Sequence, residues 1–139
     1  MPIDGALKAL YAATDFVIFD QGGDWVIKVG RAAPEIDALL DRYDSTSAGI
    51  VSAWNPRSTL LPPAENAARH SALMNLLNAR KLPFLLGEGR DTVGDWIPEA
   101  ECIVFGVTAA EGLELARAFD QYAIVFLERG KAPRLIYTE

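Results

Sequence analysis

The residues best suited to chemistry lie close together in the middle of the chain, in the segment SAWNPRSTLLPPAEN at residues 52–66. An apolar run ends there in Trp-Asn-Pro, and a double proline then opens a helix. The polar and aromatic candidates are Trp54, Asn55, Ser58, Glu65, Asn66 and the nearby Arg69. Amides and a guanidinium can orient a polar or anionic group, an indole can stack on it, and a carboxylate can move a proton. The segment therefore marks a candidate site at a strand-to-helix junction.

The helix after the double proline should turn part of this set toward the sheet. At 100° per residue, one broad face holds Asn66, Arg69, Leu73, Leu76 and Leu77. We expect the leucines to pack on the sheet, which would point Asn66 and Arg69 inward, toward Asn55 and Glu101. An arginine in such a place needs a carboxylate or another hydrogen-bond partner, and Glu65 or Glu101 can supply one.

Hydrophobic periodicity and turn residues predict the order α β β α β α β β α β β. The predicted elements are a helix over 4–14, a hairpin of DFVIFD and DWVIKV around Gly22-Gly23, a helix from Pro34, the strand AGIVSAW, a helix over 63–80, a strand over 84–86, a glycine-rich loop over 87–96, a strand over 102–107, a helix from Thr108 with a capping-box spacing to Glu111, the strand AIVFLE, and a strand over 134–137.

The pattern from Gly49 to Glu128 reads βαββαβ, which is typical of a ferredoxin-like split βαβ unit. We therefore predict one globular domain over residues 1–139, of the α+β class. Its ferredoxin-like core would carry an N-terminal helix and a β-hairpin extension, and the last strand would extend the same sheet. A three-layer α/β fold is the alternative.

In such a unit, strand ends, a helix start and the glycine-rich loop meet at one sheet edge. The predicted ligand-binding residues there are Trp54, Asn55, Ser58, Asn66, Arg69, Gly87, Gly89, Trp96 and Gln121, and Glu65 and Glu101 are the catalytic candidates. Helix N-termini and glycine-rich loops offer N–H groups to anions, although this loop lacks the Lys-Ser/Thr of a P-loop.

A structural interpretation stands beside each candidate. Asn55 and the proline after it can simply end a strand, and Glu65 with Arg69 can form a solvated pair. His70 is the only histidine and has no partner at a catalytic or metal-ligand spacing. Cys102 begins an apolar strand and is expected in the core. No cofactor and no metal are predicted.

Composition excludes several classes of protein. The chain has 139 residues, 13 Lys plus Arg, 19 Asp plus Glu and a net charge of -6, so nucleic acid is not an expected partner. A single cysteine rules out a disulfide framework. The N-terminus does not read as a signal peptide, and no apolar run is long enough for a membrane span. The expected location is the cytoplasm, and the oligomeric state stays open.

Five separated blocks carry a resemblance to a known family: SAWNPRS, PAENAARHSAL, GEGRDTVGDW, EAECIVFGV and FDQYAIVF. In this order they resemble the bacterial domain of unknown function 3293 family. The matching residues are Trp54, Asn55, Pro56, Ser58, Glu65, Asn66, Arg69, Gly87, Gly94, Trp96, Glu101 and Gln121. Cys102, Asp120 and Tyr122 depart from that pattern. The resemblance implies a shared site but no activity.

Two functions follow from these observations. The first is binding of a small polar or anionic molecule at the sheet edge, with Arg69 and the asparagines as recognition groups; catalysis is left open. The alternative is a non-enzymatic interaction or regulatory module in which the Arg/Glu/Asn cluster is structural.

Overall fold

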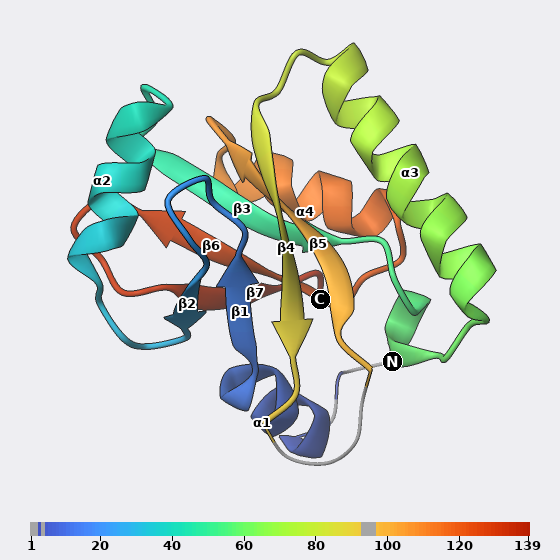
Figure 1. The fold of residues 1–139 in the computed structure, drawn as a ribbon. Helices are drawn as coiled ribbons and strands as arrows, with labels where there is room; N and C mark the ends of the chain where they lie inside the picture. Colours follow the sequence, from blue (N-terminus) through green and yellow to red (C-terminus); the bar gives the residue numbers. More distant parts are fainter. Residues whose placement is uncertain (1–2, 4, 93–96) are drawn as a thin grey trace.

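The structure is a computed structural model that describes residues 3, 5–92 and 97–139 (Figure 1). Its helices are α1 (Gly5–Ala13), α2 (Pro34–Arg42), α3 (Pro63–Ala79) and α4 (Ala109–Ala118), with a short 3-10 turn η1 (Pro56–Ser58). Its strands are β1 (Asp15–Ile18), β2 (Trp25–Lys28), β3 (Ser47–Ser52), β4 (Phe84–Arg90), β5 (Glu99–Phe105), β6 (Ala123–Glu128) and β7 (Arg134–Tyr137). Residue 4, at the start of the predicted first helix, and Trp96 lie outside the described residues.

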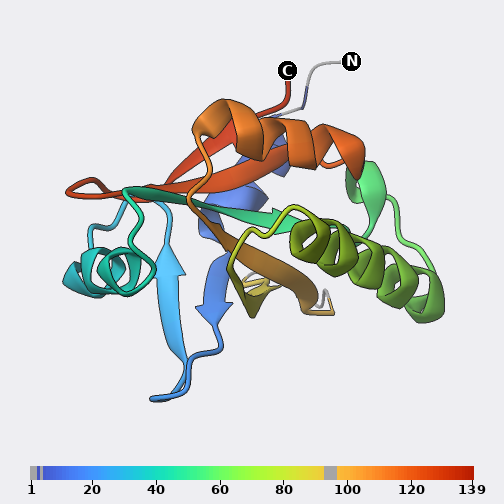
Figure 2. The same cartoon turned by 90° about the horizontal axis from the view of Figure 1, so that it is seen from above.

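The strands of the described residues form one sheet in the order β2-β1-β4-β5-β3-β6-β7, which differs from their order in the chain. Every neighbouring pair of strands is antiparallel. The sheet is strongly curled, so that β1 and β2 run across the direction of β6 and β7 (Figure 2). As predicted, the N-terminal hairpin extends the sheet beyond β4, and β7 extends it beyond β6. The architecture is therefore an α/β fold around a half-closed antiparallel sheet.

Helices cover both faces of this sheet. Leu73 and Leu77 of α3 pack with Leu115 of α4 on the outer, convex face, in one apolar cluster. Ile36 and Leu40 of α2 belong to a second cluster on the concave face. The two clusters alternate along β3, β5 and β6, as side chains on a pleated strand must. The concave face beyond α2 is left to α1, and the candidate site lies there.

The local sequence at Thr108 and Glu111 explains where α4 begins. Thr108 Oγ1 accepts a hydrogen bond from the Glu111 N–H at 3.1 Å, and the Thr108 N–H donates to Glu111 Oε1 at 2.9 Å. This reciprocal pair is the capping box predicted from the T-A-A-E spacing, and it satisfies two backbone donors at the start of α4. The predicted bounds of the last strand, 134–137, are also confirmed.

The predicted glycine-rich loop over 87–96 is wrong in its first half, because β4 continues to Arg90. Gly87 pairs with Glu101 across the sheet, and Gly89 pairs with Glu99. A Cβ added to Gly87 would lie 2.3 Å from the Val17 carbonyl oxygen. The glycine therefore allows β1 to approach β4 closely, and it does not form a phosphate-binding loop.

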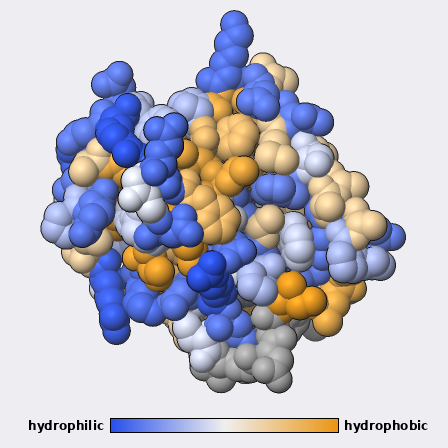
Figure 3. All heavy atoms as spheres, in the orientation of Figure 1, coloured by the Kyte–Doolittle hydropathy of each residue, from blue (hydrophilic) through white to orange (hydrophobic). Residues whose placement is uncertain are grey.

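The outer side of β2, β1 and β4 extends beyond the helices. Val26, Leu86 and Phe19 remain exposed there, at 47%, 43% and 37%. The strand pairing places these three side chains on the face of the sheet that α3 and α4 cover. Ile18 and Gly87 lie on the opposite face. Figure 3 shows apolar surface between α2 and α3 on this side of the molecule.

Candidate functional site

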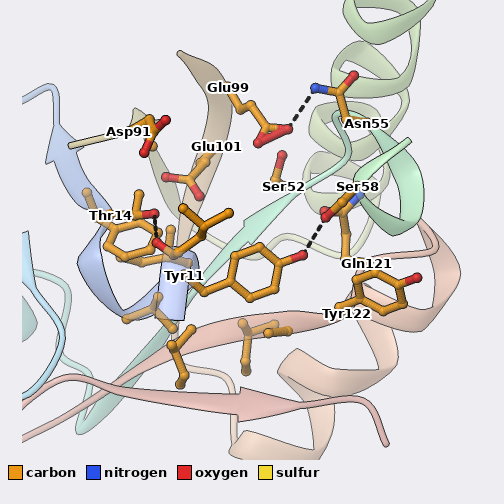
Figure 4. A pocket seen from close by; sticks show the side chains of 18 of the residues that line it. Tyr11, Thr14, Ser52, Asn55, Ser58, Asp91, Glu99, Glu101, Gln121 and Tyr122 are labelled. Atoms are coloured by element: carbon orange, nitrogen blue, oxygen red, sulfur yellow. Dashed lines mark hydrogen bonds between the residues drawn. The ribbon is translucent and has the colours of Figure 1, made fainter. Parts of the chain in front are cut away.

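A pocket lies between α1 and the concave face of the sheet and has a volume of about 130 Å³. Its apolar wall includes Leu7 and Leu10 of α1, with Ile50 and Val125 from the sheet. Its polar side carries three carboxyl groups, and Figure 4 shows Asp91, Glu99 and Glu101 together on that side. Among the described residues that line the pocket, none is a lysine or an arginine. The site is thus acidic at one side and apolar at the other.

Glu101 is the most unusual group in the pocket. Its side chain comes from the concave face of β5, between Gly87 of β4 and Ser52 of β3. Only 8% of the residue is exposed, and within the described residues its carboxyl has no hydrogen-bond partner. Burial raises the pKa of Glu101 well above its ordinary value, and the charges of Glu99 and Glu88 raise it further. These surroundings favour the protonated carboxyl.

Gly89 leaves room beside this carboxyl. A Cβ added to Gly89 would lie 3.4 Å from both carboxyl oxygens of Glu101, at the limit of ordinary contact. Gly89 thus belongs to the pocket as a wall without a side chain, although it lies on a strand and not in the predicted loop.

Glu99 lies two residues before Glu101 on the same face of β5, so both carboxyls face the pocket. Asn55 Nδ2 donates a hydrogen bond to Glu99 Oε1 at 3.0 Å. Burial raises the pKa of Glu99, and the hydrogen bond from Asn55 acts in the opposite direction. The two neighbouring carboxyls therefore have different surroundings, since of these two only Glu99 receives a hydrogen bond from a described residue.

Helix α1 forms the roof of the pocket. Within this described helix no residue is fully buried, because its apolar side faces the pocket. Tyr11 Oη and Ser58 Oγ are 2.6 Å apart and share a hydrogen bond, which joins α1 to η1. Burial raises the pKa of Tyr11. Thr92 Oγ1 also donates to the Ala13 carbonyl at 2.6 Å. Hydrogen bonds at the C-terminal half of α1 therefore attach this helix to η1 and to the segment after β4.

Asn55 and Asn66 fix the segment on the polar side of the pocket. The Asn55 N–H donates to Asn66 Oδ1 at 2.9 Å, and Asn66 Nδ2 donates to Asn55 Oδ1 at 2.8 Å. The Leu61 N–H also donates to Asn55 Oδ1, at 3.0 Å. Asn55 has φ 44°, a left-handed conformation that asparagine adopts more readily than most residues. Both asparagines are buried, which confirms that Asn66 points inward.

Arg69 points to backbone and not to Glu101, so the predicted carboxylate pairing is wrong. Its Nε donates to the Ala53 carbonyl at 2.7 Å, and its Nη2 donates to the Phe119 carbonyl. Gln121 Nε2 donates to the Trp54 carbonyl at 2.9 Å. These contacts tie the end of β3 to the end of α4. The physical reason is that carbonyls at strand and helix ends lack partners within their own elements and accept the hydrogen bonds of the Arg69 guanidinium.

The structure brings some predicted residues together and leaves others apart. Asn55, Ser58, Gly89, Glu101 and Gln121 line the pocket. The predicted residues that do not line it are Trp54, Glu65, Asn66, Arg69 and Gly87, and Trp96 lies outside the described residues. Glu65 is exposed on α3. Within the described part of the chain, the Trp54 Nε1 and His70 Nδ1 atoms are buried without a hydrogen-bond partner.

Cys102 is buried in the outer core, as predicted, and burial raises the pKa of its thiol to about 12. Such a thiol is not a nucleophile near neutral pH.

Sequence reasoning missed Tyr11, Glu99 and Tyr122, all of which line the pocket. The spacing E-A-E at residues 99–101 was a usable signal, because alternate residues on a strand share a face. No sequence pattern indicated that α1 lines the pocket, because its position over the sheet depends on tertiary packing.

The chemistry available to this site is proton transfer and hydrogen bonding. A carboxyl with a raised pKa holds its proton more strongly and can act as a general acid, whereas an ionised carboxylate can act as a base. Among the described residues, no group of three or more histidine, cysteine, aspartate or glutamate side chains could hold a metal ion.

The fold and the site together define a small α/β domain with an acidic pocket inside a curled antiparallel sheet. Residues 51–124, more than half of the chain, match the family described as "Protein of unknown function (DUF3293)". The chain belongs to this family, which confirms the resemblance. Searches of curated proteins and of solved structures gave no match. Within the described residues, no helix has the length and apolar character needed to cross a membrane.

Proposed function

We propose that this domain binds a small polar molecule in the pocket between α1 and the sheet. The observation that carries the proposal is Glu101, a buried carboxyl that faces an open pocket and has no protein partner among the described residues. Burying such a group costs free energy unless something hydrogen-bonds to it. A ligand with a hydrogen-bond donor would supply that partner.

The lining favours a neutral or cationic ligand over the anionic ligand expected from the sequence. Asp91, Glu99 and Glu101 would repel an anion. Arg69, which the sequence suggested as the group that binds an anion, donates its hydrogen bonds to backbone carbonyls instead. Asn55 and Ser58 also line the pocket, where they form hydrogen bonds with Glu99 and Tyr11.

A thermal-shift screen of small alcohols, sugars, amines and amino acids on the full chain tests this proposal. The pocket is blocked by Leu10→Trp, which adds volume on the roof, where no side chain is fully buried. The matched control is Leu60→Trp, because Leu60 is 67% exposed and does not line the pocket. We expect compounds that stabilise the parent and the control but not the blocked variant. Equal stabilisation of all three chains would contradict the proposal.

A second candidate is a non-enzymatic interaction or regulatory module. Its support is that Arg69 and Asn66 serve to hold chain segments together and do not line the pocket. On this account Arg69→Ala would lower the free energy of unfolding, and no small molecule would stabilise the parent in the screen.

We also propose that β3, α3, β4, β5, α4 and β6 form the ferredoxin-like split βαβ core expected from the sequence. The sheet order β4-β5-β3-β6 and the packing of α3 and α4 on one face support this assignment.

A further inference from the structure

We propose that the ligand of this pocket is a small organic ammonium ion with a short apolar body, held by Glu101 and Glu99. This inference rests on the proposed small-molecule function and names the chemical class of its ligand.

Charge is the first argument for an ammonium group. The pocket is lined by Asp91, Glu99 and Glu101 and by no described lysine or arginine. Glu101 and Glu99 lie on one face of one strand, so two ionised carboxylates there would repel each other in a poorly hydrated place. An ammonium ion offsets that repulsion and donates hydrogen bonds to both groups. A neutral hydroxyl supplies a hydrogen bond but no compensating charge.

The remaining walls fit the rest of such a ligand. Tyr11 and Tyr122 line the same space as the carboxyls, and aromatic rings attract cations through their faces. Leu7, Leu10 and Ile50 supply an apolar wall for a short carbon chain. The volume of about 130 Å³ gives room for a short carbon chain.

Binding of a cation should be coupled to release of a proton. In the free protein the surroundings of Glu101 favour its protonated form, and an ammonium ion beside it favours the ionised form. The charged groups that act on Glu101 are Glu99 on its own strand and Glu88 on β4, while Asp91 and Tyr11 face the same pocket from the end of β4 and from α1. Each of these neighbours is acidic, so none of them substitutes for the cation.

The test uses three probes with the same carbon chain: n-butylammonium, 1-butanol and butyrate. Binding to the full chain is followed by chemical-shift changes, and the butylammonium titration is repeated by calorimetry in two buffers with different ionisation enthalpies. We expect butylammonium to bind at least about tenfold more tightly than butanol, butyrate not to bind, and net proton release when butylammonium binds. Glu101→Gln should lose about tenfold in butylammonium affinity, and Glu65→Gln should not.

The outcomes separate the two proposals. If butanol binds as tightly as butylammonium and no proton is released, the ammonium assignment is wrong while small-molecule binding stands. If none of the probes binds and the compound screen is also negative, both proposals fail. The proton count on the parent chain needs no variant, so it decides the question even if Glu101→Gln is poorly folded.

Discussion

The polar residues that the sequence marks as one candidate site divide into two kinds. Asn55, Asn66 and Arg69 are satisfied by other parts of the chain, whereas the Glu101 carboxyl has no hydrogen-bond partner among the described residues. A satisfied buried polar group holds a structure together, and an unsatisfied one costs free energy. The cluster that the sequence marks as one site therefore consists of a structural part and a part that faces the pocket.

At this scale we predict that Asn66→Ala destabilises the fold. The substitution removes both bonds to Asn55 and leaves the buried Asn55 N–H without an acceptor. The free energy of unfolding should fall by about 2–3 kcal/mol, as measured by denaturant titration. Asn75→Ala is the matched control, because Asn75 is exposed on the same helix. A loss of less than about 0.5 kcal/mol in Asn66→Ala would contradict this role of the asparagine pair.

The two glycines of strand β4 have different structural roles. Gly87 allows β1 to lie against β4, and Gly89 leaves space beside Glu101. A glycine in a strand is read from sequence as a loop residue, because it is rare in strands. Only the close approach of a neighbouring strand reveals why glycine is required there.

We predict that Gly87→Ala destabilises the protein more than Gly89→Ala does. The new Cβ would lie 2.3 Å from the Val17 carbonyl oxygen in the first variant, whereas in the second its nearest neighbours are 3.4 Å away. Overpacking against backbone costs about 1–3 kcal/mol. Melting temperatures of the two variants, measured side by side, check the order, and an equal or reversed order would contradict the packing argument.

The order of elements was predictable from the sequence because each has a strong local signal, such as the capping box of α4 and the hairpin at Gly22-Gly23. The inward placement of Asn66 followed from helical periodicity. The partners of Arg69 and the position of α1 could not be predicted, because both depend on which segments the curled sheet brings together.

Across the whole molecule, the curl of the sheet and the partial cover of α1 create an acidic pocket in an already acidic protein. The pocket should influence stability as well as binding. Glu101 has a raised pKa in the folded chain and an ordinary one, near 4.5, when unfolded. Above that lower pKa the folded chain binds more protons than the unfolded chain, so the free energy of unfolding falls as pH rises.

We predict that Glu101→Gln removes part of this pH dependence. Gln resembles the protonated carboxyl but carries no titrating proton. In the pH range above the ordinary glutamate pKa of 4.5, the stability of the variant should rise relative to that of the parent as the pH increases. Denaturant titrations across this range measure the difference, with Glu65→Gln as the exposed control. Parallel curves for the parent and Glu101→Gln would exclude the assigned protonation.

The most direct test of the account is an NMR titration of the Glu101 side-chain carboxyl carbon in the full chain, with and without n-butylammonium. The account predicts a midpoint well above the ordinary glutamate value of 4.5 in the free protein, which moves downward when the cation is present. A midpoint near the ordinary value that does not move with the cation would contradict it.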